Sequence, residues 1–217
     1  MSMREQPSEA FLCADDEVIN HGHPQILALA AKLSGQNPED TARNCFDWVR
    51  DQITHSIDFH REEVTCLASD VLGVGTGLCI AKSHLLVALW RAHRIPSGFC
   101  YQRLALDGPS SPYCTHGFVA VWLEGTGWYR CDARGNSKPG IHCTFTPGHE
   151  NLAYATVHEG EHEYPGIWAQ PWPELVTAMK RLKNISHYLM HPIDAAPPPF
   201  CDHDHVVAYR GGPSPSG

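Results

Sequence analysis

The sequence predicts an α+β fold in which helices come first and an antiparallel sheet follows. Apolar residues recur with a helical period of about 3.6 up to residue 93, and after Pro96 they alternate with a period of two. A chain of 217 residues is long enough for one well-buried domain. We therefore divide it into an N-terminal arm (1–22), a main domain (23–194) and a flexible C-terminal tail (195–217).

Four segments of the first half have helical composition or periodicity and are predicted as helices: 24–34, 38–53, 62–72 and 78–93. Asn37 can cap the second of these helices, and Pro38 suits its first position. The fourth helix follows a glycine-rich loop at 73–77, and its apolar stripe indicates burial: Leu78, Leu85, Leu86, Leu89 and Trp90.

Three segments after Pro96 alternate as strands do: 98–104, 116–123 and 128–132. The last two flank Glu124-Gly125-Thr126-Gly127, which predicts a hairpin turn. Residues 145–157 are expected to add a strand and residues 172–189 a closing helix. We expect the arm to be loosely attached with a short strand, and the proline- and glycine-rich tail to be largely disordered.

Composition excludes several classes of function. The net charge is −8 and Lys and Arg do not cluster, so we expect no nucleic-acid partner. A run of about 18 apolar residues is missing, so we expect no membrane span. The N-terminus lacks the pattern of a secretory signal, which favours a cytoplasmic location. The nine cysteines contain no Cys-x-x-Cys pair, so most are expected to be free, buried thiols.

The glycine-rich loop at 73–77 does not match a nucleotide-binding motif. A P-loop needs Gly before Lys-Ser, and the sequence has Ala81 there. The dinucleotide pattern fails because Leu78 occupies its third glycine position.

The loop does place Cys79 in the first turn of a buried helix. Free N–H groups and the positive end of the helix dipole favour a thiolate at such a position and could hold an oxyanion. The alternative is that Cys79 is only a small core residue at a tight helix start.

A nucleophilic thiol needs a base, and the base needs an orienting group. His116 begins an apolar strand, and Asp132 ends the strand predicted to pair with it. A hairpin that pivots at Glu124 would place the two side chains level, whereas a turn centred on Gly125-Thr126 would offset them by three residues. Each also has a structural alternative, as a strand histidine and as a turn residue.

Several blocks of the sequence resemble bacterial members of the transglutaminase-like superfamily. The nucleophile helix and the strand after it are similar to Thr76-Gly77-Leu78-Cys79, Lys82-Ser83-His84-Leu85-Leu86 and Arg94-Ile95-Pro96-Ser97-Gly98. The histidine strand is similar to Thr115-His116-Gly117-Phe118, and the aspartate strand to Trp128-Tyr129-Arg130-Cys131-Asp132-Ala133-Arg134-Gly135-Asn136. The order Cys, His, Asp agrees, and the likeness covers about residues 20–190.

The resemblance implies a papain-like core, in which the nucleophile helix packs on the sheet that carries His and Asp. It implies that 23–194 is a catalytic domain with Cys79 as nucleophile, His116 as base and Asp132 as orienter. It also implies acyl transfer through a thioester with no obligate cofactor and no metal. The expected substrate is a peptide, a protein or a small amide.

The acceptor remains open. We favour hydrolysis of a peptide-like amide, and the alternative is transfer to an amine, as in a transglutaminase or an amide-forming biosynthetic enzyme. A non-catalytic, peptide-binding scaffold is a further alternative. A narrow, water-poor tunnel lined by Trp would favour the amine acceptor.

Other polar residues are interpreted as structural. His55-Ser56-Ile57-Asp58 and Asp70 are expected to brace the glycine-rich loop, and His84 to lie on a different helix face from Cys79. Packing is also favoured for Tyr101-Gln102-Arg103. The Cys201-Asp202-His203-Asp204-His205 cluster, and His142-Cys143 with His149, could bind a metal on paper, but their mixed ligands are a weak signal.

Overall fold

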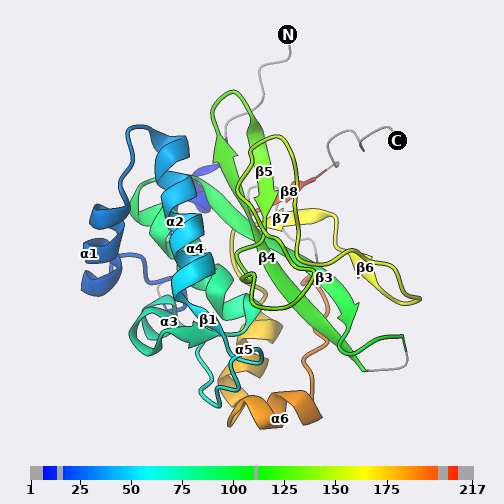
Figure 1. Cartoon of the computed structure of the whole chain (residues 1–217). Coiled ribbons are helices and arrows are strands. Elements are labelled where there is room, and N and C mark those ends of the chain that lie inside the picture. The colour runs from blue at the N-terminus through cyan, green and yellow to red at the C-terminus, as the bar shows by residue number, and fades with distance from the viewer. Residues whose placement is uncertain (1–6, 14–16, 110–111, 200–204, 210–217) are drawn as a thin grey trace.

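The computed structural model describes residues 7–13, 17–109, 112–199 and 205–209. Helices and an antiparallel sheet form two packed layers (Figure 1), so the predicted α+β class is confirmed. The helices are η1 (Glu9–Phe11, a 3₁₀ turn), α1 (Pro24–Leu33), α2 (Pro38–Gln52), α3 (Ala68–Val74), α4 (Cys79–Ala92), α5 (Pro173–Arg181) and α6 (Ile185–Met190).

The main sheet has the strand order β5-β4-β3-β7-β8, with β6 also paired to β3, and every pairing in it is antiparallel. Its strands are β3 (Ser97–Ala105), β4 (Tyr113–Leu123), β5 (Gly127–Cys131), β6 (His162–Glu163), β7 (Gly166–Trp168) and β8 (Val206–Ala208). A separate parallel pair joins β1 (Thr54–His55) to β2 (Thr76–Gly77).

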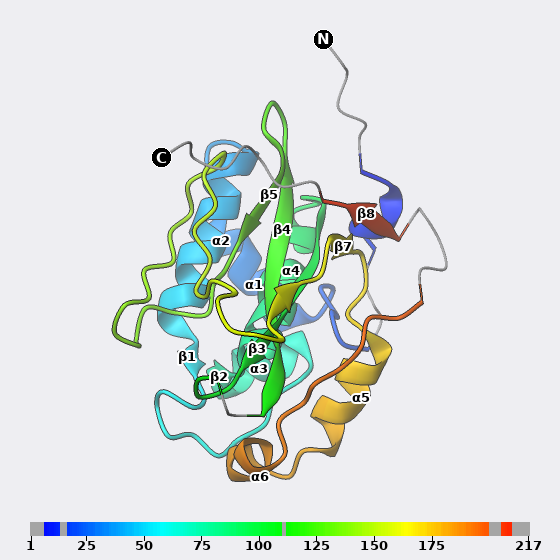
Figure 2. The same cartoon turned by 90° about the vertical axis from the view of Figure 1, so that its right-hand side faces the viewer.

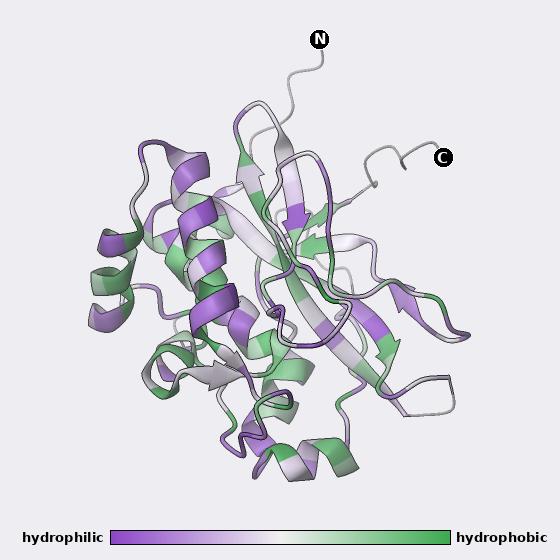
Figure 3. Cartoon of the chain, in the orientation of Figure 1, coloured by the Kyte–Doolittle hydropathy of each residue, from purple (hydrophilic) through white to green (hydrophobic). Residues whose placement is uncertain are grey.

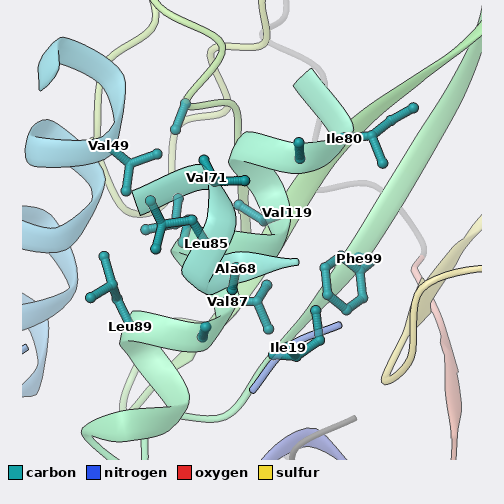
Figure 4. Packing of buried hydrophobic residues seen from close by; sticks show 14 of the residues in the cluster. Ile19, Val49, Ala68, Val71, Ile80, Leu85, Val87, Leu89, Phe99 and Val119 are labelled. Carbon is teal, nitrogen blue, oxygen red and sulfur yellow. The ribbon is translucent and has the colours of Figure 1, made fainter. Parts of the chain in front are cut away.

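Helix α4 lies at the centre of the main core because it is apolar on nearly all sides. Twelve of its residues, Ile80 to Arg91, are buried. Figure 4 shows its side chains packed between α2, α3 and the sheet, with Val49, Val71 and Val119 as labelled neighbours. Helix α2 covers α4 from outside, and Figure 3 accordingly shows it with many hydrophilic residues. A helix that is apolar all round needs such covering on every side.

The start of α4 lies close against β4. A Cβ atom at Gly117 would lie 3.1 Å from Cγ1 and 3.2 Å from Cα of Ile80, so a larger residue would push the helix away. This close approach brings the first turn of α4 to the beginning of β4, and therefore Cys79 toward His116.

The β4–β5 hairpin pivots at Gly125, between the two registers considered above. Leu123 pairs with Gly127 and Val119 with Cys131. Asp132, one residue past the ladder, would therefore lie opposite Phe118, two residues from His116. The turn residues Gly125 and Gly127 have φ of 83° and 85°, which only glycine adopts readily.

Several predicted boundaries change. The helix expected in 62–72 begins only at Ala68, and no strand forms in 145–157. The closing helix expected over 172–189 is two helices, α5 and α6. It breaks because Asn184 is extended and its side chain accepts a hydrogen bond from the backbone N–H of His187, which starts a new helix.

The arm and the tail both pack where the structure describes them. The described part of the arm, 7–13 and 17–22, contains no strand: residues 9–11 form η1, and Phe11 lies fully buried against Trp128 with the ring centroids 4.8 Å apart. In the tail, residues 206–208 form β8, which pairs with β7 beside η1 (Figure 2). The boundaries at 22 and 195 stay predictions. Residues 201–204 of the proposed tail metal cluster lie outside the described residues.

None of the helices within the described ranges is long and apolar enough to cross a membrane.

Candidate active site

Cys79 is the first residue of α4 and lines a cavity of about 960 Å³. Leu78 precedes it in an extended conformation and has no side-chain cap, so the first N–H groups of the helix are not used by a cap. Gly75 ends α3 at a φ of 76°, which lets the chain turn directly into β2 and then α4. The thiol is half-buried.

His116 lines this cavity, and Asp132 is a buried partner of its ring. Nε2 of His116 is 2.8 Å from Oδ2 of Asp132, and the two residues are only 3% and 1% exposed. Asp132 also accepts hydrogen bonds from the backbone N–H groups of Arg134 (2.9 Å) and Ala153 (3.2 Å). The ring of Tyr154 packs edge-on against His116 at 5.1 Å. These contacts fix the tilt of the imidazole and leave Nδ1 for the thiol.

The charges of the three residues stabilise one another. Burial alone would raise the pKa of the Cys79 thiol, but the charge and hydrogen bond of His116, and then those of His55, lower this pKa to about 5. Burial would lower the pKa of His116, but the Cys79 thiolate and the Asp132 carboxylate raise it to about 10. Burial acts against the charge of Asp132 too, yet His116 holds the pKa of this carboxyl below its usual value. At a pH between about 5 and about 10, the site therefore holds the Cys79 thiolate and the His116 imidazolium.

A second histidine contacts the thiol, and sequence reasoning did not assign it to the site. His55 is buried, lines the cavity and hydrogen-bonds Cys79. The bracing expected of this segment is present, because Ser56 N–H donates to the Gly77 carbonyl at 3.1 Å. The available signal was a His and an Asp three residues apart, directly upstream of the glycine-rich loop.

Asp58 forms the outer part of this second group. It accepts two hydrogen bonds of 2.8 Å from the Arg134 guanidinium and one from the Ser137 hydroxyl. Burial works against its charge, but His55, Arg134 and Ser137 hold the pKa of the Asp58 carboxyl far below its usual value. Arg134 therefore contacts both carboxylates, Asp58 through its side chain and Asp132 through its backbone.

The other polar residues considered in the sequence lie away from the cavity wall. His84 is buried and bonds the Cys66 carbonyl at 2.7 Å. Tyr101 packs on Trp172, and Gln102 bonds the Tyr154 carbonyl at 3.2 Å. Arg103 forms an ion pair with Asp194.

Among the residues that the structure describes, no three His, Cys, Asp or Glu side chains are grouped as metal ligands would be. This includes His142, Cys143 and His149, the second group considered above.

Residues 27–133 match the family described as the transglutaminase-like superfamily, a span that contains Cys79, His116 and Asp132. No relative was found among curated proteins.

Two solved structures are similar over 57% of this chain. The first, described as "a Putative Cysteine Protease from Cytophaga hutchinsonii", is 20% identical with a TM-score of 0.44 and is covered over 40% of its chain. The second, the periplasmic domain of TgpA from Pseudomonas aeruginosa, is 17% identical with a TM-score of 0.43 and is covered over 45%. The chain thus spans less than half the length of these structures, and at such scores they bear on neither fold nor activity.

Residues 27–133 therefore carry the core of the transglutaminase-like superfamily, with Cys79, His116 and Asp132 in the order Cys, His, Asp.

Proposed function

We propose that the protein is a cysteine-dependent acyl-transfer enzyme that hydrolyses a peptide-like amide through a thioester intermediate. One observation carries this proposal: a thiol at the start of a helix faces a histidine that is hydrogen-bonded at 2.8 Å to a buried carboxylate. Nucleophile, base and orienter in this arrangement are the elements of a catalytic triad.

In the first step the Cys79 thiolate attacks the carbonyl carbon, and the carbonyl oxygen gains negative charge. The backbone N–H of Cys79, free at the helix start, donates to this oxygen. The carbon–nitrogen bond then breaks, and the His116 imidazolium gives its proton to the leaving amine. Asp132 holds the ring in position throughout.

In the second step water attacks the thioester carbon, and neutral His116 takes a proton from it. The carbon–sulfur bond then breaks, which releases the carboxylic acid product and returns Cys79 as a thiolate beside the His116 imidazolium. The cavity supports water as the acceptor because its described lining contains no Trp and includes the charged residues Asp58, Asp107, Arg134, Lys138 and Glu161. These charged groups keep water near the thioester, whereas transfer to an amine needs water to be excluded.

Trapping of the acyl-enzyme tests this function. The purified chain is mixed with a panel of peptidyl and glutaminyl substrates, quenched in acid and analysed by intact mass spectrometry, with Cys79→Ala as control. We expect an acyl adduct on Cys79 that decays in water. An adduct that decays only when an amine is added would establish amine transfer instead. A chain that binds substrates without ever forming an adduct would be a non-catalytic scaffold.

A further inference from the structure

The position of His55 is fixed by the short β1–β2 pair. His55 is opposite Gly77, two residues before Cys79, so the two strands end side by side at the nucleophile. The side chain is 6% exposed and shares the cavity wall with Cys79 and His116. Lys82, from the second turn of α4, donates from its Nζ to the carbonyl of Ile53 just before β1. The nucleophile helix itself thus holds the strand that carries His55.

The ring of His55 has a defined orientation. Its Nδ1 lies 3.6 Å from Oδ1 of Asp58, an ionised carboxylate whose own position is fixed by Arg134 and Ser137. The other ring nitrogen, Nε2, is then the one available to the thiol and to a substrate in the cavity.

The two histidines differ in how tightly their carboxylates bind them. His116 is 2.8 Å from Asp132, which takes its other hydrogen bonds from neutral backbone groups. His55 is 3.6 Å from Asp58, whose charge is already paired with the Arg134 guanidinium. His116 is therefore the better-oriented base.

We propose that His55 is a second catalytic residue of this centre, which donates a hydrogen bond from Nε2 to the carbonyl oxygen of the substrate as Cys79 attacks. The sulfur–carbon bond forms, the π electrons of the carbonyl move to oxygen, and this oxygen accepts hydrogen bonds from His55 and from the Cys79 backbone N–H. When the intermediate collapses, the leaving group departs and His55 retains its proton. This inference rests on the proposed function.

Two reactions of Cys79 separate a role on the oxyanion from a role on the thiol. Acylation by p-nitrophenyl acetate passes through a tetrahedral oxyanion, whereas alkylation by iodoacetamide does not. Both rates are measured on the full chain at pH 7, with Cys79→Ala for background. We expect His55→Ala to slow acylation by about 100-fold, the loss typical of a missing oxyanion donor, and to slow alkylation by less than about tenfold.

Two further variants make the comparison sharper. His55→Gln keeps an N–H donor of similar reach, so part of the acylation rate should return, and it serves as the second variant if His55→Ala fails to fold. His60→Asn changes an exposed histidine of the same segment, at a positive φ that Asn tolerates, and should leave both rates unchanged.

Equal losses of acylation and alkylation in His55→Ala would overturn the inference, because His55 would then act only through the thiol. Acylation within threefold of the wild type in His55→Ala and His55→Gln would overturn it as well. A wild-type chain whose Cys79 is alkylated rapidly below pH 7 but never acylated would overturn the proposed function, and this inference with it.

Discussion

Cys45 and Cys79 both belong to helices that meet in the main core, yet their surroundings shift the thiol pKa in opposite directions. Cys45 lies in the middle of α2 with no exposed surface, and burial raises its pKa to about 12. Cys79 lies in the first turn of α4 beside His116 and His55, and its pKa falls to about 5. Burial by itself therefore raises the pKa of a thiol in this protein and keeps it protonated, and a neighbouring cation reverses that effect.

Replacing the nucleophile has the largest expected effect on this contrast. Cys79→Ala should reduce acyl-enzyme formation by roughly 10⁶-fold, as loss of a triad nucleophile does, because no other thiol can replace it. Its free energy of unfolding should change by about 1 kcal/mol and its melting temperature by only a few degrees, since the half-buried thiol contributes little packing. Intact mass spectrometry and thermal melting measure the two outcomes. A large loss of stability with residual acylation would favour the structural interpretation of Cys79.

Removing the main cation should make Cys79 behave more like Cys45. In His116→Gln the midpoint of the alkylation-rate profile should rise from about pH 5 toward the ordinary range near 8.5. At pH 6 the rate of alkylation by iodoacetamide should therefore fall by about 100-fold, because far less thiolate is present. An unchanged midpoint would mean that His116 does not set the thiol pKa.

The pH dependence of hydrolysis gives a smaller effect with a defined sign. Activity should rise as pH increases through about 5, where Cys79 loses its proton, and fall as pH increases through about 10, where His116 loses its own. Asp132 raises the pKa of His116, so Asp132→Asn should move the alkaline limb to lower pH and leave the acid limb in place. A profile of kcat/KM against pH measures both limbs. Movement of the acid limb alone would contradict this assignment.

The smallest effect is expected from the matched substitution in α2. Cys45→Ala should leave acylation unchanged and lower the free energy of unfolding by about 1 kcal/mol, or about 2–4 °C in melting temperature. Peptide mapping after alkylation of the folded protein should find Cys79 modified and Cys45 not. Modification of Cys45 at a similar rate would remove the contrast between the two thiols.

The sequence was most informative where long segments carry a clear period. Helix α4 and the β4–β5 hairpin could be predicted, because each depends on a pattern of many residues or on a strong turn. The placement of Cys79 near His116 and Asp132 was implied by the family resemblance. The register of the hairpin could not be predicted, since it depends on where the chain turns between Glu124 and Gly127, and both Gly125 and Gly127 take a positive φ.

The parts that were missed depend on short, long-range pairings. Strands β1 and β2 have two residues each, too few for any period, so nothing local shows that His55 meets Cys79. Strand β8 lies in a tail whose composition suggests disorder, and its partner β7 lies 40 residues upstream. The burial of Phe11 could not be predicted for a similar reason, because its partner Trp128 lies far along the chain.

The reacting groups come from different layers: Cys79 is supplied by the helices, and His116 and Asp132 by the sheet. Before the layers dock, Cys79 is an ordinary thiol and His116 an ordinary imidazole, so a partly folded chain has almost no thiolate at neutral pH. The chain is thus protected during synthesis from reacting with its own backbone or with neighbouring proteins.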